Sequence, residues 1–194
     1  MVLGAQDYLI KGMHSGAEIW RLIRHAISRN VVVVESESAR EREHYNATHC
    51  PLTDLPNRRL FFSLAQERIE KFQQARRNAD QLAVCMLDLD GFKKINDNFG
   101  HPVGDETLRQ VSNVLRQNLR NSDIIARLAG DEFVLMIGPP ISYEHVRLVA
   151  SRVVNAISQI KQVFQYPVTL GASLGAAVFP NSASTLDDLM HYAD

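Results

Sequence analysis

Residues 123–138 read DIIARLAGDEFVLMIG, in which two apolar runs flank a short polar turn at 129–132. This pattern predicts two antiparallel strands joined by a tight hairpin. A second apolar run, QLAVCMLDLD at 81–90, is too short for a buried helix and ends in carboxylates. It is therefore predicted to be a central strand, and this strand and the hairpin form the centre of the expected fold.

Helix and strand patterns continue on both sides of this centre. Pro56 is placed to begin a helix whose apolar face carries Leu60, Phe61, Leu64, Ile69 and Phe72. Residues 91–105 form a turn-rich stretch that leads into a helix with apolar positions Leu108, Val111, Leu115 and Leu119. A further helix carries Val146, Val149, Val153, Ile157 and Ile160, and residues 167–178 alternate as a strand with one buried face. This order indicates a split βαβ, or ferredoxin-like, α+β arrangement.

The first 50 residues differ from the rest. Residues 14–29 place Ile19, Ile23, Ala26 and Ile27 on one stripe, which predicts an amphipathic helix. The four valines at 31–34 fit either a strand or a continuation of that helix. The polar, charged segment that follows suits a connector, so a domain boundary is expected near residue 50.

Composition excludes several classes of protein. The chain has 194 residues, a net charge of −1 and 45% hydrophobic residues, which suits one domain with an appendage and gives no basic surplus for nucleic acid. No apolar run approaches the ~20 residues that span a bilayer, and no secretory signal begins the chain, so a cytoplasmic protein without a membrane segment is expected. The scattered histidines argue against a histidine metal site, and Cys85 is expected to be a small buried residue.

Four acids are expected to meet at one edge of the sheet. The first strand of a split βαβ sheet lies beside the hairpin, so Asp88, Asp90, Asp131 and Glu132 could converge. Carboxylates this close repel unless a cation lies between them, and Mg²⁺ prefers such oxygen ligands together with substrate phosphates. The GFKK segment that follows the strand suits a phosphate cradle, so metal-assisted phosphoryl or nucleotidyl transfer is indicated. The alternative is that these acids merely occupy strand ends and a turn, where Asp and Gly are common.

Several blocks together resemble the GGDEF family of diguanylate cyclases. They are PLTDLPNRR at 51–59, DLDGFKKINDNFGHPVGD at 88–105, RLAGDEF at 127–133 and ASLGAAVFP at 172–180. The resemblance implies a palm-like βααββαβ sandwich with a central antiparallel sheet, preceded by a helical N-terminal arm. It also implies condensation of two GTP molecules into cyclic di-GMP plus pyrophosphate by a Mg²⁺-dependent homodimer, with Mn²⁺ as an alternative metal.

The resemblance also assigns roles to individual residues. Asp131 and Glu132 match the catalytic acids, and the metal ligands match the side chains of Asp88 and Asp131 and the backbone carbonyl of Leu89. The residues that match contacts to GTP are Gly91, Phe92, Lys93, Asn96, His101, Asp105 and Gly130. Arg120 and Asp123 form an RxxD motif that matches the inhibitory product-binding site. The competing interpretations are a helix cap for Asp105, a solvated charge for Lys93 and a local ion pair for RxxD.

The ends of the chain suggest a piece of a longer signalling protein. Residues 1–13 resemble the tail of a response-regulator receiver domain, so residues 1–50 are interpreted as a receiver remnant, last helix and connector. Residues 51–194 are interpreted as a GGDEF domain that is incomplete at its C-terminus. Ala129 stands where the family signature has its first glycine. The alternative function is therefore a weak or inactive module that binds GTP or cyclic di-GMP and regulates a fused domain such as an EAL phosphodiesterase.

Overall fold

The computed structural model describes residues 45–74, 81–139 and 141–194, together with residues 16, 20, 21, 23, 24, 27, 42 and 43. Two compact units divide the chain between Ala47 and Thr48. In the first unit the described positions 16, 20, 21, 23, 24 and 27 are helical, and the apolar side chains Trp20, Ile23 and Ile27 are exposed. Residues 1–13 and 31–34, for which a receiver tail and a strand or helix are predicted, lie outside the described residues.

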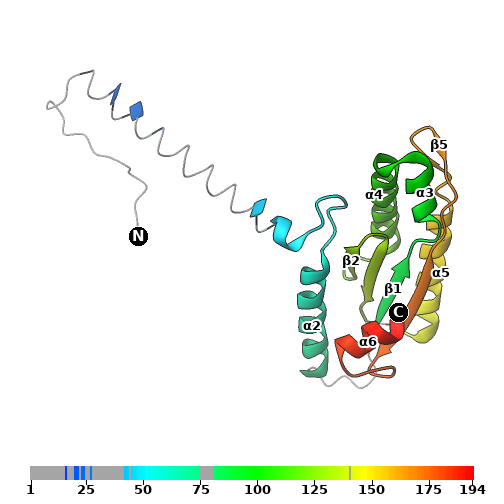
Figure 1. The fold of residues 1–194 in the computed structure, drawn as a ribbon. Coiled ribbons are helices and arrows are strands. Elements are labelled where there is room, and N and C mark those ends of the chain that lie inside the picture. The colour runs from blue at the N-terminus through cyan, green and yellow to red at the C-terminus, as the bar shows by residue number, and fades with distance from the viewer. Residues whose placement is uncertain are drawn as a thin grey trace. The chain divides into compact units, whose positions relative to one another are not determined.

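The second unit is built on a four-stranded sheet with the order β2-β3-β1-β6 (Figure 1). Its strands are β1 (Leu82–Asp88), β2 (Ile124–Ala129), β3 (Glu132–Ile137) and β6 (Ser173–Phe179), and every neighbouring pair is antiparallel. A smaller two-stranded sheet joins β4 (Gln162–Val163) to β5 (Tyr166–Pro167). The predicted antiparallel α+β fold is confirmed, with the first apolar run at 81–90 supplying a central strand.

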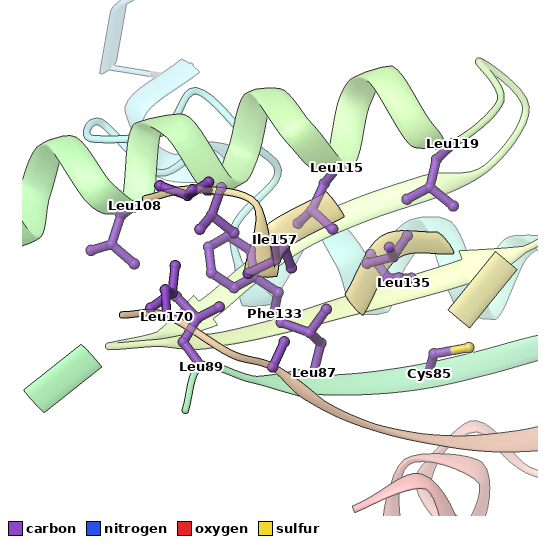
Figure 2. Packing of buried hydrophobic residues seen from close by; sticks show 14 of the residues in the cluster. Cys85, Leu87, Leu89, Leu108, Leu115, Leu119, Phe133, Leu135, Ile157 and Leu170 are labelled. Atoms are coloured by element: carbon purple, nitrogen blue, oxygen red, sulfur yellow. The ribbon is translucent and has the colours of Figure 1, made fainter. Parts of the chain in front are cut away.

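Strand β1 is buried on both faces, which explains its nearly continuous apolar sequence. Ala83, Cys85 and Leu87 join the core beneath α4 (His101–Asn118) and α5 (Tyr143–Ser158). Leu82 and Val84 join a second core with α2 (Arg58–Gln74) and α6 (Leu186–Ala193) on the other face. Figure 2 shows the first core, where leucines of α4 point toward Phe133 and Leu135 of β3. Two packed faces fix β1 and β3 in position.

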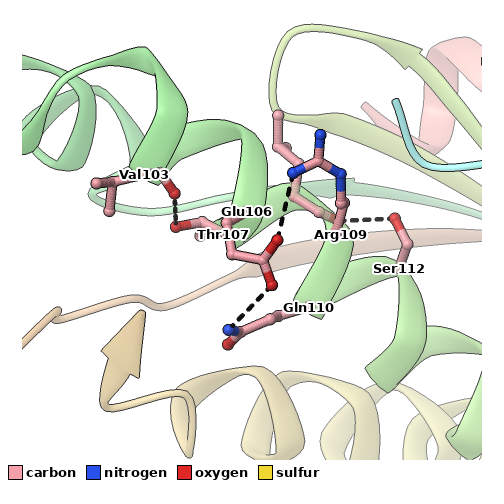
Figure 3. Close-up of polar contacts among 7 residues, drawn as sticks. Val103, Glu106, Thr107, Arg109, Gln110 and Ser112 are labelled. Carbon is pink, nitrogen blue, oxygen red and sulfur yellow. Dashed lines mark hydrogen bonds and ion pairs between the residues drawn. The ribbon is translucent and has the colours of Figure 1, made fainter. Parts of the chain in front are cut away.

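The long helix α4 satisfies its buried polar groups internally. The hydroxyl groups of Thr107 and Ser112 are buried and donate to the carbonyls of Val103 and Leu108, four residues earlier (Figure 3). On its exposed flank Glu106 accepts hydrogen bonds from Arg109 and Gln110. Helix α4 therefore buries its apolar stripe without leaving these hydroxyls unpaired.

Residues 91–105 contain more helix than the turn-rich prediction allowed. Helix α3 (Phe92–Phe99) lies between two glycines with positive φ, Gly91 at 90° and Gly100 at 83°. The glycines and polar residues suggested turns, but Phe92 and Ile95 are buried against the sheet and make the segment amphipathic. Tertiary burial of these two side chains overrides the local turn signal.

Two further boundaries differ from the sequence prediction. Helix α2 begins at Arg58, and the Asn57 side chain accepts the backbone N–H of Leu60 at 3.1 Å, so Asn57 caps the helix and Pro56 precedes it. Of the predicted strand at 167–178, Pro167 belongs to β5 and β6 begins only at Ser173; the irregular segment between them buries Val168, Leu170 and Ala172. From Ala177 to Phe179, β6 is buried at consecutive positions because both cores cover this end.

Gly175 allows α6 to approach the sheet. A Cβ atom on Gly175 would lie 2.1 Å from the backbone oxygen of Ala193, the last residue of α6. This contact involves two backbones, so neither partner can move away without shifting α6.

We predict that Gly175→Ala destabilises the second unit by about 1–3 kcal/mol, because the added methyl group displaces α6. Chemical denaturation measures this change. Gly138→Ala is the matched control, since a Cβ there meets mainly the flexible end of Arg68 at 3.3 Å. Equal stability losses in the two variants would contradict the proposed packing of α6 on Gly175.

Candidate active site

The pairing of β1 with β3 brings the predicted acids to one end of the sheet. Asp88, the last residue of β1, lies opposite Glu132, the first residue of β3. Gly130 and Asp131 form the two-residue turn between β2 and β3. Residues that are more than 40 positions apart in the sequence thus share one edge.

The turn fits the residues that form it. The positive φ, 48°, falls on Gly130, whereas Ala129 is the last residue of β2 and pairs with Glu132. A shift in register between Arg127 and Ala129 marks a bulge just before the turn. Alanine in place of the first signature glycine is therefore compatible with this backbone.

Like charges crowd the end of β1. Partial desolvation, followed by the negative charges of Asp131 and Asp90, raises the pKa of the Asp88 carboxyl above its ordinary value. A cation between Asp88 and Asp131 would relieve this repulsion, and carboxylate oxygens are the ligands that Mg²⁺ prefers. Within the described ranges, no three histidine, cysteine or acidic side chains gather into a ready-made metal site. The two carboxylates of Asp88 and Asp131 suit a metal that keeps water and phosphate ligands.

Asp90 does not act as a free member of this acidic group. Its backbone exchanges two hydrogen bonds with Gly171, each 3.0 Å long. Both carboxylate oxygens lie 3.1 Å from the Ser173 hydroxyl, which donates to them. Asp90 therefore fastens the end of β1 to the segment before β6, while Asp88, Asp131 and Glu132 stay at the sheet edge.

A cleft of about 450 Å³ opens beside Asp88 and Glu132. Asp88, Glu132, Ser173 and Gly175 line it from the sheet, and Ala193 lines it from α6. In size it falls within the range of small-molecule sites.

The N-terminus of α3 follows the acids directly. Gly91 is the N-cap of α3, and a Cβ there would lie 3.0 Å from the Thr169 carbonyl, so both its φ and its surroundings favour glycine. The Phe92 side chain is buried, whereas Lys93 is exposed and forms no ion pair within the described part of the chain. Backbone N–H groups at a helix start, with a lysine beside them, favour an anionic ligand.

Asn96, Gly104 and Asp105 lie at the junction of α3 and α4. A Cβ on Gly104 would lie 1.9 Å from Asn96 Oδ1, so the Asn96 carboxamide lies directly over this glycine. His101 and Asp105 are exposed on the first turns of α4, whose N-cap is Gly100. Asp105 is therefore not a helix cap, and it lies one position from the glycine that the Asn96 amide contacts.

A family comparison agrees with this arrangement. Residues 47–194 match the family model described as "Diguanylate cyclase, GGDEF domain". The chain belongs to the GGDEF family of diguanylate cyclase domains. The resemblance inferred from the sequence blocks is thereby confirmed for this part of the chain.

Individual relatives extend the comparison. MucR of Pseudomonas aeruginosa, named a bifunctional diguanylate cyclase/cyclic di-GMP phosphodiesterase, is 41% identical over 169 residues, which are 86% of this chain and 24% of MucR. The solved GGDEF domain of TpbB from the same organism is 35% identical, with a TM-score of 0.70 over 75% of this chain and 84% of that one. The GGDEF domain of DgcB from Caulobacter crescentus, solved in complex with cyclic di-GMP, is 25% identical, with a TM-score of 0.65 over 76% of this chain and 86% of that one. The chain thus spans 24% of the length of MucR.

The GGDEF domain has a second, larger cleft at the other end of β2. It measures about 650 Å³ and contains the RxxD pair, Arg120 and Asp123, together with Arg68, Lys71 and Arg116. Arg68 and Arg116 donate to backbone carbonyls, and Lys71 pairs with Glu67. Among these described basic side chains, only the Arg120 guanidinium has neither a hydrogen bond nor an ion pair.

Asp123 holds the backbone around this cleft. Its Oδ2 accepts the Arg120 N–H at 2.9 Å and its Oδ1 accepts the Gly138 N–H at 3.1 Å. These contacts close the open end of the β2–β3 hairpin. They also replace the local Arg120–Asp123 ion pair considered from the sequence, which is absent among the described residues.

Arg127 and Cys50 are not among the site residues predicted from the sequence. The Arg127 side chain donates twice to the Gly130 carbonyl, at 2.9 and 2.7 Å, and once to Cys50 Sγ at 3.2 Å. The two residues are 77 positions apart, so no local pattern could reveal this contact. The only available signal was the presence of Arg127 at the start of the RLAGDEF block.

We predict that Asp88→Asn raises the melting temperature by about 2 °C in a metal-free buffer, because it removes one of the crowded charges. The exposed position of Asp88 keeps the gain small. Differential scanning fluorimetry with EDTA measures it, and Asp97→Asn on the exposed side of α3 is the control. Added Mg²⁺ should stabilise the unchanged domain more than the Asp88 variant. A lower melting temperature for Asp88→Asn would show that these charges do not repel.

Proposed function

We propose that this GGDEF domain condenses two GTP molecules into cyclic di-GMP, releasing two pyrophosphates, as half of a homodimer. The observation that carries the proposal is the crowding of Asp88 and Asp131 beside the N-terminus of α3. A cation relieves the repulsion between crowded carboxylates, and the free N–H groups at a helix start bind phosphates. Family membership and relatives named diguanylate cyclases support the same activity.

Three groups would hold the metal: the carboxylates of Asp88 and Asp131 and the carbonyl of Leu89. Mg²⁺, or Mn²⁺, bound there would offset the phosphate charge and lower the pKa of the attacking 3′-hydroxyl. The backbone of Gly91 and Phe92 and the Lys93 ammonium would bind the triphosphate of GTP. Gly130, in the turn next to Asp131, leaves space for the nucleotide because it has no side chain.

Asp131 would receive the proton of the attacking hydroxyl. The 3′-oxygen of one GTP forms a bond to the α-phosphorus of the other, and the bond to pyrophosphate breaks. Glu132, which lies directly opposite Asp88, adds a further negative charge to the same edge of the sheet. Two such transfers close the ring of cyclic di-GMP.

Guanine recognition is assigned to Asn96 and Asp105, with His101 lining the pocket. An amide offers both a donor and an acceptor, and a carboxylate accepts from guanine N–H groups. The close contact between Asn96 and Gly104 supports this assignment, because it restricts the position of the amide.

The reaction requires two domains that face each other, since each holds one GTP. Trp20, Ile23 and Ile27 in the N-terminal unit are exposed on one helical stripe, at spacings of three and four residues. Such a stripe favours pairing of two helices. An upstream receiver domain and a downstream EAL domain stay predictions about a longer protein.

We predict that Asp131→Ala abolishes formation of cyclic di-GMP and leaves the fold intact, because Asp131 lies in a two-residue turn outside both cores. Chromatography after incubation with GTP and Mg²⁺ measures the product, and circular dichroism checks the fold. Asp187→Ala on the exposed side of α6 is the control and should keep its activity.

Product formation by Asp131→Ala and by the unchanged domain tests the catalytic assignment. Unchanged product in Asp131→Ala would refute the catalytic assignment. Binding of GTP without any product from the unchanged domain would favour the alternative function, a nucleotide-binding regulatory module. The backbone at Ala129 gives that alternative no support, because the residue belongs to β2 and leaves the positive φ to Gly130.

We further propose that cyclic di-GMP binds the larger cleft and inhibits the cyclase. The free guanidinium of Arg120 can donate a pair of parallel hydrogen bonds to the acceptors of a guanine base or to a phosphate group. The backbone bonds of Asp123 hold the motif in place while leaving further acceptor capacity on both carboxylate oxygens.

We predict that Arg120→Ala weakens product inhibition by at least about tenfold, because it removes a charge-assisted hydrogen-bond donor from the cleft. The inhibition constant of cyclic di-GMP, compared with that of the unchanged domain, measures the effect. Arg147→Ala on the exposed flank of α5 is the matched control, since among the described residues Arg147 pairs only with Glu144, three positions earlier. Equal inhibition constants in Arg120→Ala and the unchanged domain would exclude the cleft as the inhibitory site.

A further inference from the structure

Arg127 links the signature turn to the segment at 48–57. Its Nε and Nη2 atoms converge on the Gly130 carbonyl at 2.9 and 2.7 Å, which fixes the peptide group before Asp131. Its backbone N–H donates to the Pro56 carbonyl at 3.0 Å. The remaining donor, Nη1, reaches Cys50 Sγ at 3.2 Å. One guanidinium therefore holds the turn on one side and is held by a sulfur on the other.

The segment at 48–57 is a rigid anchor for this sulfur. His49 bridges to Pro56, and Cys50 exchanges backbone hydrogen bonds of 2.8 Å with Leu55 and Asp54. The Thr53 hydroxyl is buried and interacts with the Cys50 thiol, and it has no other partner in the described chain. The sulfur is thus fixed by backbone pairing on one side and adjoins a buried hydroxyl without another partner.

The surroundings of Cys50 favour the thiolate. Desolvation alone would raise the pKa of the thiol, but hydrogen bonds from Thr53, from the Leu52 backbone and from Arg127 together bring it below its ordinary value. Cys50 is half-buried, so small reagents can reach it. Cys85, in contrast, is fully buried, and burial raises the pKa of its thiol to about 12. Reactivity toward thiol reagents should therefore be confined to Cys50.

We propose that Arg127 is a positioning residue that holds the turn of Gly130 and Asp131 through its contact with Cys50, and that modification of the Cys50 thiol loosens this turn. The proposal rests on the proposed function, because the turn matters for catalysis only if Asp131 acts there. The added methylthio group enlarges the sulfur and occupies space beside it, so Nη1 of Arg127 can no longer stay at 3.2 Å and this hydrogen bond is lost. The guanidinium is then free to leave the Gly130 carbonyl.

Methyl methanethiosulfonate supplies a defined modification. The Cys50 thiolate attacks the sulfenyl sulfur, an S–S bond to a methylthio group forms, and methanesulfinate leaves; the thiol proton goes to solvent. Dithiothreitol reverses the reaction by thiol–disulfide exchange. Mass spectrometry counts the added groups, and one per chain is expected.

The activity test compares the full chain before and after this treatment. Modification should lower kcat for cyclic di-GMP formation at least about tenfold with little change in KM, because small displacements of a catalytic group have effects of this size. Cys50→Ala should show the same loss, and Cys50→Ser, which keeps an acceptor, should retain activity and resist the reagent. Full modification with unchanged kcat, or equal sensitivity of Cys50→Ser, would overturn the proposal.

Hydrogen exchange of peptides covering 128–133 gives a readout that does not depend on turnover. Exchange should accelerate on modification of the unchanged chain and in Arg127→Lys, but not in modified Cys50→Ser or in the control Arg147→Lys. Faster exchange without any cyclase activity in the starting protein would refute the proposed function and leave the positioning role in place. Unchanged exchange would refute the positioning role even if cyclic di-GMP is made.

Discussion

The antiparallel register between β1 and β3 is the constraint on which the rest of this structure depends. It sets Asp88 opposite Glu132 and puts the turn of Gly130 and Asp131 beside both. A slip of one residue would turn Asp88 into the core and move the apolar residues of β1 to the wrong faces. Because β1 is packed on both faces, the cost of such a slip falls on two cores at once.

The same burial allows negative charges to be kept close together. Isolated carboxylates would separate to avoid the repulsion that raises the pKa of Asp88. Here each acid is attached to a strand end or a two-residue turn that the cores hold in place, so the repulsion is balanced by packing elsewhere in the domain. This is a common relation between stability and function at sites prepared for a cation.

The β2–β3 hairpin joins the two candidate ligand sites of the domain. Asp123 closes its open end through the N–H groups of Arg120 and Gly138, and Arg127 fixes its turn through the Gly130 carbonyl. Strand β2 has six residues, so the two ends are roughly 20 Å apart. A ligand in the larger cleft and a nucleotide at the acidic edge would therefore contact opposite ends of one rigid element.

The sequence by itself determined the types of most elements, the central place of β1 and the family of residues 51–194, because apolar periodicity and contiguous motifs are local properties. It also predicted that Asp88, Asp131 and Glu132 share an edge, since strand order in a split βαβ sheet requires this. Only the tertiary structure decided that residues 92–99 form a helix and that Asp90 binds Ser173. It also decided that Asp123 accepts hydrogen bonds from backbone N–H groups and that Arg127 reaches Cys50. The physical reason is that these outcomes depend on burial and on partners distant in the sequence, neither of which a local pattern of residues specifies.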